Sequence, residues 1–235
     1  MSFLVIVILS QAVAAVVVYL SNYFLDRRIS QSENGDIEIL GEDNKVEGQF
    51  VIVIHFIFAL IFAYIAENKF GEWHIYQLFI IVSYLILVSI IDLRLRLILH
   101  SMSLIGAVVF GIIGNLQHGF VETVIGGLAG FTGGYLIYLI AAISNKWIMT
   151  RKNMDASEIP FGFGDVTLLG VIGLLLGWPG VIAGIFLGMF SAGIFSAGLI
   201  LWKWLRGNYE AFSTIPLGPF LAFGAIISIV LAAKT

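Results

Sequence analysis

The chain has 235 residues, of which 60% are hydrophobic and only 11% are charged, and its formal net charge is −3. This composition excludes an ordinary soluble domain and is typical of a polytopic membrane protein. The chain contains no cysteine, which excludes disulfides and thiolate metal sites.

Eight apolar runs follow one another along the chain, and we expect each to form a transmembrane helix of an all-α bundle. Most of them reach the ~20 residues that cross a hydrocarbon core of ~30 Å. The first is too long, and too poorly followed by small residues, to be a cleaved signal peptide. The runs cover residues 3–24, 50–66, 75–91, 98–113, 121–144, 165–177, 180–202 and 214–233.

Two longer polar segments interrupt this pattern. Residues 29–48 hold six of the fifteen acidic residues, and they are expected to form a solvated loop or a short hairpin around Asn34-Gly35. Residues 145–164 are expected to form a second long loop. We therefore divide the chain into a first transmembrane helix with its acidic cytoplasmic loop, residues 1–48, and a transmembrane core, residues 49–235.

The distribution of basic residues predicts the orientation. With eight spans, the first, third, fifth and seventh loops share one side of the membrane, and they hold ten of the twelve Lys and Arg residues. The positive-inside rule makes these loops cytoplasmic and leaves both termini outside. The ten residues are Arg27, Arg28, Lys45, Arg94, Arg96, Lys146, Arg151, Lys152, Lys203 and Arg206.

Glycines recur at intervals of four residues on two of the predicted spans. Small residues at this spacing let helix backbones approach closely in lipid, where van der Waals packing drives association. We interpret these glycines as helix-packing seams and not as a binding site. They are Gly126, Gly130 and Gly134 on the fifth span, and Gly180, Gly184 and Gly188 on the seventh.

Two acidic residues stand at the ends of apolar runs. Asp92 ends a run of seventeen residues, and Asp165 begins the sixth span within "FGFGDVTLLG". A carboxylate near hydrocarbon is costly and usually has a partner or a function. By the topology above, both acids lie at cytoplasmic span ends. The alternative is structural: Asp92 could pair with Arg94 or Arg96, and Asp165 could cap its own helix.

The surroundings of Asp165 suggest a reaction. The sixth span has only thirteen residues, roughly 20 Å of helix, so Asp165 is expected below the membrane surface in a cavity that admits water. Two carboxyls in one such cavity do not both ionise easily, and a shared proton suits water activation. Gly162 and Gly164 would let an extended peptide approach this loop and are the expected substrate-positioning residues.

The chain resembles the type 4 prepilin peptidases, membrane aspartic proteases of the GxGD group, from about residue 50 to its end. The segments that carry the resemblance are "IIDLRLRLILHSMSLIGAVVFGI", "FGFGDVTLLGVIGLLLGWPG" and "STIPLGPFLAFGAIISI". The last contains the Ile-Pro-x-Gly-Pro-Phe run of the family. Three matches in the right order and at the right intervals are far more specific than the GxGD pattern alone.

The resemblance implies that Asp92 and Asp165 are the catalytic pair of an endopeptidase that removes the leader of prepilin-like substrates. Such substrates carry a short basic leader before a hydrophobic helix, and the cut is made at the cytoplasmic face of the cell membrane. The family usually has Pro at the position of Leu99 and often Lys at that of Thr167. Larger members also methylate the new N-terminus and carry cysteine pairs, which this chain lacks.

Other functions remain open at this point. The two aspartates could serve a transporter or a proton-coupled permease, although they lie at span ends and no inverted repeat is visible. An intramembrane protease of the presenilin or signal-peptide-peptidase kind uses the same dyad, and a peptidase-like scaffold without activity would keep the fold. The dispersed histidines have no metal-ligand spacing, and no cofactor motif, phosphate loop or nucleic-acid-binding patch is found. We therefore expect no cofactor and no nucleic-acid partner.

Overall fold

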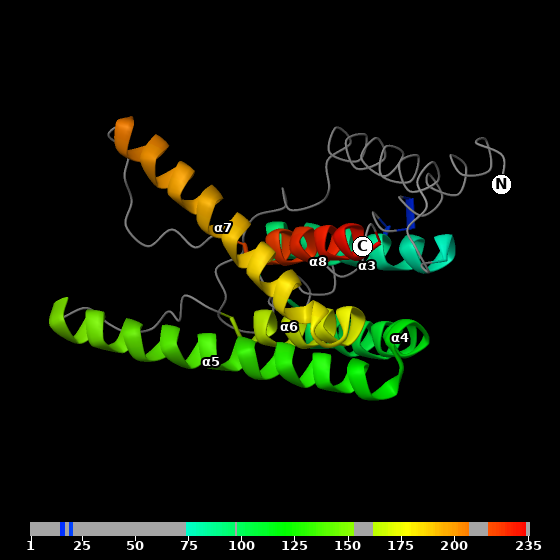
Figure 1. The fold of residues 1–235 in the computed structure, drawn as a ribbon. Coiled ribbons are helices and arrows are strands. Elements are labelled where there is room, and N and C mark those ends of the chain that lie inside the picture. The colour runs from blue at the N-terminus through cyan, green and yellow to red at the C-terminus, as the bar shows by residue number, and fades with distance from the viewer. Residues whose placement is uncertain are drawn as a thin grey trace, which may run out of the picture.

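The computed structural model describes residues 15–16, 19–20, 74–96, 98–152, 162–206 and 216–233. Within these ranges the chain forms α-helices and no strand, so the all-α class is confirmed. The predicted spans 3–24 and 50–66 and the acidic loop 29–48 lie outside the described residues, apart from four helical positions in the first run. The helices are α3 (Ile75–Leu95), α4 (His100–His118), α5 (Phe120–Lys152), α6 (Phe163–Leu176), α7 (Gly180–Leu205) and α8 (Gly218–Ala232) (Figure 1).

Four of these helices are long and apolar enough to cross a membrane, namely α3, α4, α5 and α7. The other two are apolar but shorter, with 14 residues in α6 and 15 in α8. At 1.5 Å per residue, α6 is roughly 21 Å long, which is shorter than a hydrocarbon core of ~30 Å. The predicted short sixth run is thus confirmed as a helix, whereas eight full spans are not.

The boundary of α5 differs from the prediction. The helix was expected to end at residue 144 and to give way to a loop over 145–164, but it continues to Lys152 and has 33 residues. The extension "NKWIMTRK" is more polar than the span before it, which is why hydropathy placed the end too early. It contains no Gly or Pro, and Lys, Met and Arg are good helix formers, so nothing in it stops the helix.

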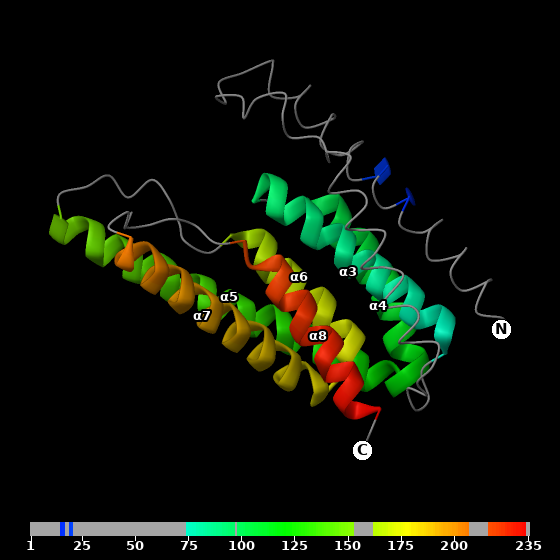
Figure 2. The ribbon, with the colours of Figure 1, turned by 90° about the horizontal axis from the view of Figure 1, so that it is seen from above.

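Helix α6 lies at the centre of the bundle, where it contacts α4, α5, α7 and α8. Nine of its 14 residues are buried, as expected for a helix that is apolar on all sides. Viewed from above, α3 and α4 lie on one side of α6, and α5 and α7 lie on the other (Figure 2). Helix α8 packs against both α3 and α7, so it joins the two sides.

The predicted glycine seams are confirmed. A Cβ added at Gly126, Gly130 or Gly134 of α5 would meet successive residues of α6 in reverse order, from Gly173 back to Val166. The two helices therefore run antiparallel in very close contact. On the other side of the bundle, Gly188 of α7 lies against the backbone of α8. A Cβ added at Gly188 would be 3.1 Å from the Cα of Leu221.

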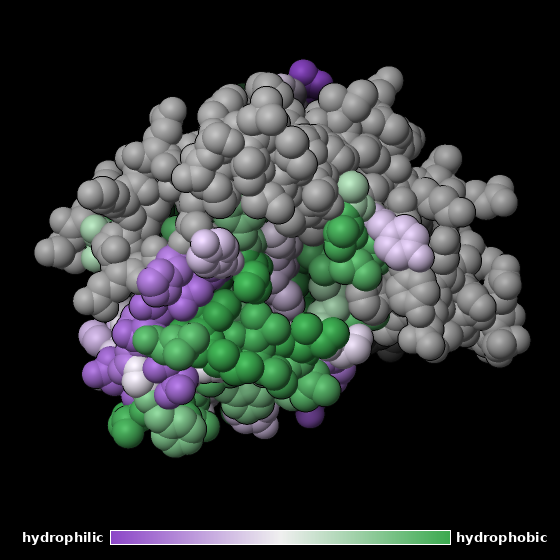
Figure 3. All heavy atoms as spheres, turned by 90° about the vertical axis from the view of Figure 1, so that its right-hand side faces the viewer, coloured by the Kyte–Doolittle hydropathy of each residue, from purple (hydrophilic) through white to green (hydrophobic). Residues whose placement is uncertain are grey.

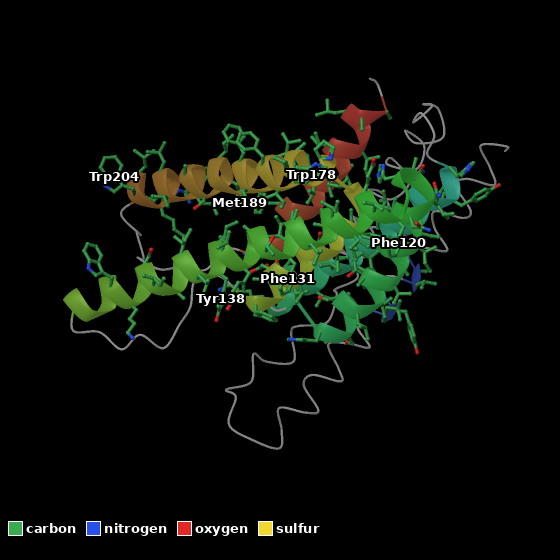
Figure 4. The ribbon with its side chains drawn as sticks, turned by 60° about the horizontal axis from the view of Figure 1, so that its bottom comes forward. Phe120, Phe131, Tyr138, Trp178, Met189 and Trp204 are labelled. Atoms are coloured by element: carbon green, nitrogen blue, oxygen red, sulfur yellow. The ribbon has the colours of Figure 1, made fainter. Side chains whose placement is uncertain are left out.

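The outer surface is apolar over much of its area. Figure 3 shows a contiguous hydrophobic patch bordered by hydrophilic side chains on one face of the molecule. Trp178 lies just before α7 and Trp204 near its end, and Met189 lies between them (Figure 4). Trp178 and Trp204 are exposed. Aromatic residues at both ends of an exposed apolar helix are typical of a membrane span.

Candidate active site

Asp92 lies in the last turn of α3 and is almost completely buried, with 4% of its surface exposed. The helix continues to Leu95 and ends at Arg96, whose left-handed backbone (φ 50°) lets its N–H donate to the Asp92 carbonyl at 2.8 Å. The carboxyl group itself is held by another helix. The backbone N–H of Gly218, at the start of α8, donates to Asp92 Oδ2 at 2.7 Å.

Asp165 lies in the first turn of α6 and is partly buried. Its Oδ2 accepts the N–H of Gly162 at 3.2 Å, and its own N–H donates to the Gly162 carbonyl at 3.1 Å. The carboxyl of Asp165, three residues into the helix, thereby accepts the N–H of the N-cap residue Gly162, a donor that has no partner inside the helix. The capping interpretation of Asp165 is therefore confirmed. The capping hydrogen bond occupies one of the two carboxyl oxygens, Oδ2.

The fold places the two carboxyl groups within electrostatic reach of each other. They come from the C-terminal turn of α3 and the N-terminal turn of α6, and the negative charge of Asp92 acts on Asp165. Both groups are screened from solvent by the surrounding helices. Like charges in such surroundings disfavour each other, so the two groups do not both ionise easily.

The two glycines of the Gly-Phe-Gly-Asp sequence have different surroundings. A Cβ at Gly164 would lie 2.8 Å from Ile98 Cβ and 3.0 Å from the Ile98 carbonyl oxygen. Gly164 thus makes room for the segment that joins α3 to α4. Gly162 is exposed, and a Cβ there would meet only Asp165 Oδ2, at 3.4 Å, and the backbone N of Gly164, at 3.9 Å.

Two positions at which the chain departs from the prepilin-peptidase pattern lie beside these glycines. Leu99 precedes α4 with φ −73° and ψ 135°, an extended conformation that proline also adopts. Thr167 donates to the Gly164 carbonyl at 2.8 Å, and its hydroxyl is 2.9 Å from that of the buried Ser103 on α4. The hydroxyl pair connects α4 to the first turn of α6.

A cavity of about 420 Å³ opens between α4, α5 and α6; Thr167, two residues after Asp165, lines it, whereas Asp165 does not. Its lining is almost wholly apolar, and its polar groups come from His100, Ser103 and Thr167. At the start of α6, the ring of Phe163 stacks on that of His100, with 6.2 Å between the ring centroids, and it meets two aromatic rings of α5 edge-on. These are Phe131 and Tyr138, which follow one another along α5 (Figure 4).

Sequence reasoning missed Gly218, which contacts Asp92, and the stacked rings of His100 and Phe163 at the start of α6. Gly218 stands in the quoted Ile-Pro-x-Gly-Pro-Phe run, which was the available signal, but no role was attached to it. Histidine and phenylalanine carry no such signal in a chain so rich in aromatic residues. Among the described residues, no three His, Asp or Glu side chains gather as a metal site would require.

The sequence was then compared with known protein families. Residues 79–197, just over half of the chain, match the sequence model of the type IV leader peptidase family. The chain belongs to the type IV leader peptidase family. Both aspartates fall inside the matched segment, and Gly218 falls beyond it.

Curated relatives carry the same family identity. The chain is 32% identical over 122 residues to a prepilin leader peptidase/N-methyltransferase of Aeromonas salmonicida, and this alignment covers 51% of the chain and 37% of the relative. A protein of that description from Pectobacterium carotovorum is 26% identical over 155 residues, covering 65% of this chain and 50% of the relative. The chain thus spans half or less of the length of the relatives it matches. No solved structure matches it.

Proposed function

We propose that the chain is a membrane-embedded aspartic endopeptidase that removes the N-terminal leader of type 4 prepilin-like substrates. The observation that carries this proposal is the placement of Asp92 and Asp165, which come from separate helices, within electrostatic reach of each other in a largely apolar bundle. Membership in the type IV leader peptidase family supports the same reaction.

The register of α5 and α6 supports a site below the membrane surface. The apolar part of α5 runs from Phe120 to Ser144, and Gly134 contacts the backbone of Val166, the residue after Asp165. The ten residues from Gly134 to Ser144 correspond to roughly 15 Å of helix. Asp165 would then lie well inside the apolar zone, where a carboxylate is costly unless water reaches it.

In the proposed reaction, the ionised carboxyl of the pair takes a proton from a water molecule, whose oxygen attacks the scissile carbonyl carbon. The protonated carboxyl donates its proton to the carbonyl oxygen, which gives a neutral tetrahedral intermediate. Collapse of the intermediate breaks the C–N bond: the amine takes the proton gained from water, and a hydroxyl of the intermediate returns its proton to the other carboxylate as the carbonyl of the product reforms. The pair thereby returns to one shared proton, and no cofactor enters the balance.

The surroundings of the acids support an extended polypeptide as substrate. A helical substrate would hide its carbonyls, whereas an uncoiled stretch could lie along the exposed Gly162 while Gly164 shapes the loop behind it. The cavity between α4, α5 and α6 could receive apolar side chains of the hydrophobic helix that follows the leader. The curated relatives are named for prepilin leaders, and we extend that substrate class to this chain.

The proposed placement follows from charge. We propose eight transmembrane helices in the inner cell membrane, with residues 1–48 as an accessory helix and loop and residues 49–235 as the peptidase core. The basic loops, and with them the active site, would face the cytoplasm. Methyl transfer, which the names of the relatives include, is not part of the proposal.

The test is co-expression with candidate substrates: type 4 prepilins, pseudopilins, flagellin-like subunits and adhesion subunits. Leader removal is followed on a gel for the wild type and for Asp92→Asn and Asp165→Asn. Each substitution keeps the shape of the side chain but removes its proton exchange, so cleavage should fall by about 10²- to 10⁴-fold. Processing that survives either substitution at the wild-type rate would contradict the dyad mechanism.

A matched control is available on α5. Glu122 is an exposed acid in the first turn of α5, at the end of the helix remote from Asp165. Glu122→Gln removes one negative charge without touching the pair, and it should leave leader removal unchanged. An equal loss in Glu122→Gln would indicate a general effect of charge or folding instead of catalysis.

A further inference from the structure

The first turn of α8 leaves one backbone donor without a partner inside the helix. Leu217 precedes the helix and offers no side-chain cap, and its carbonyl accepts the N–H groups of Phe220 and Leu221. Pro219 has no N–H. Gly218 therefore carries the one N–H of this turn that needs an acceptor from elsewhere, because it is buried.

That acceptor is Asp92, which lies 126 residues earlier in the chain. The N–H of Gly218 donates to Asp92 Oδ2 at 2.7 Å, a short distance typical of a bond to a charged or strongly polarised acceptor. Because both groups are buried, water does not compete with the bond. The start of α8 thus fixes one oxygen of the Asp92 carboxyl.

The missing side chain of Gly218 matters as much as its N–H. A Cβ at this position would lie 2.8 Å from Asp92 Oδ2, 3.1 Å from Asp92 Cβ and 3.2 Å from Asp92 Cγ. Any larger residue would therefore press on the carboxyl group itself, and the carboxyl would have to turn or move away.

We propose that Gly218 is a positioning residue for Asp92. Its N–H and its bare Cα hold the carboxyl in one orientation, with Oδ2 engaged by α8 and Oδ1 left to exchange a proton with water and Asp165. This inference rests on the proposed peptidase function for its catalytic consequence, but the contact itself does not. It also gives a role to the glycine of the Ile-Pro-x-Gly-Pro-Phe run, residues 215–220.

The contact is tested first, without any measurement of activity. The chain has no cysteine, so an Asp92→Cys/Gly218→Cys double variant introduces the only two thiols. A Cβ at Gly218 lies 3.1 Å from Asp92 Cβ, a few tenths of an ångström short of the usual ~3.5–4.5 Å of a disulfide. The variant is oxidised in membranes, denatured in detergent and treated with maleimide-polyethylene glycol, which adds mass only to free thiols.

A matched pair controls for random oxidation. In Asp92→Cys/Gly224→Cys the second thiol is on the same helix, but a Cβ at Gly224 would point at the backbone of Gly188 on α7, 2.7 Å from its Cα. The first pair should be protected from the maleimide until it is reduced, and the second pair should be labelled throughout. Labelling of both thiols of the first pair after oxidation would overturn the contact.

The catalytic consequence is tested by Gly218→Ala. We expect its kcat for leader cleavage to fall roughly 10- to 100-fold with KM nearly unchanged, since a misplacement of about 1 Å at a reacting group can cost that much. Gly224→Ala is the control for helix packing: it should lower the melting temperature while folded enzyme keeps the wild-type kcat. Gly193→Ala, with no atom within 4 Å of the added Cβ, should change neither.

The outcomes separate the two hypotheses. If the disulfide forms and Gly218→Ala keeps the wild-type kcat, the positioning role is wrong although the contact is real. If Gly218→Ala and Gly224→Ala lose kcat equally per folded molecule, the effect is general packing, and the positioning role is again wrong. If the wild type itself cuts no prepilin-like substrate, the proposed function fails and the catalytic role of Gly218 fails with it, while the disulfide still decides the contact.

Discussion

The close contact of α5 and α6 predicts opposite effects for two glycines on the same helix. In Gly126→Ala, the added Cβ would lie 2.5 Å from the carbonyl oxygen of Gly173 and 2.7 Å from the Cα of Gly177. Ordinary contact begins at 3.4 Å, so the shortfall is 3.4 − 2.5 = 0.9 Å. Both neighbours are backbone atoms, so the helices themselves must separate. Gly133, on the same helix, has no atom within 4 Å of an added Cβ.

The magnitude follows from two opposing terms. Overpacking of this kind costs about 1–3 kcal/mol, and replacing glycine by alanine in a helix returns up to about 1 kcal/mol. We therefore expect Gly126→Ala to lose about 1–2 kcal/mol of stability, and Gly133→Ala to lose nothing or gain up to about 1 kcal/mol. For a chain of this size, the first corresponds to a melting temperature lower by about 2–8 °C.

The assay is thermal unfolding in detergent micelles followed by tryptophan fluorescence. Trp178 is a convenient reporter because it follows Gly177, which contacts Gly126. Its backbone N–H also donates to the carbonyl of Glu122, at the start of α5, at 3.0 Å. If Gly126→Ala and Gly133→Ala melt at the same temperature, the direct backbone contact between α5 and α6 is wrong.

Three further predictions concern the surroundings of the two acids. The free energy of unfolding of Leu99→Pro should lie within about 1 kcal/mol of the wild type, and the variant should process substrate normally, because the backbone at this position already has proline-like angles. A variant that fails to fold would contradict this. Thr167→Val should cost about 1–2 kcal/mol by leaving the buried Ser103 hydroxyl without its partner. The double variant with Ser103→Ala should lose no more than Thr167→Val alone, as thermal melts can check. Phe163→Ala should lower kcat/KM for leader cleavage by about 10-fold through its lost ring contacts, and Phe163→Leu should lose less; equal activity of both variants and wild type would exclude a role for the ring.

The two aspartates could be predicted because each interrupts or bounds an apolar run, where a charge is conspicuous in any chain of this composition. The sequence indicated only that both aspartates lie on the same side of the membrane, and not that their side chains lie near each other. The glycine seams of α5 and α7 were predictable for a related reason: a spacing of four residues puts small side chains on one face of a helix. Which helices they would contact was not encoded in that spacing.

The contact between Gly218 and Asp92 could not be predicted in the same way. It joins helices α3 and α8, and neither partner has a periodic pattern that points to the other. The donor is a backbone N–H, which nearly every residue type has, so the identity of the residue does not indicate the contact. Similarly, the end of α5 was misplaced because hydropathy reports where a helix leaves the apolar zone, whereas the helix itself continues until the backbone meets a reason to stop.

The unequal lengths of neighbouring helices have a consequence for the lipid around the protein. The apolar stretch of α5 has 25 residues, whereas α6 beside it has 14 in all. One bilayer thickness cannot match both, and hydrophobic mismatch of this kind is relieved by local thinning, tilt or solvation of the shorter element, at a fraction of a kcal/mol per Å. The acyl-chain length of the lipid should therefore change how much water reaches the N-terminal end of α6. Membrane thickness would in this way affect the hydration of Asp165.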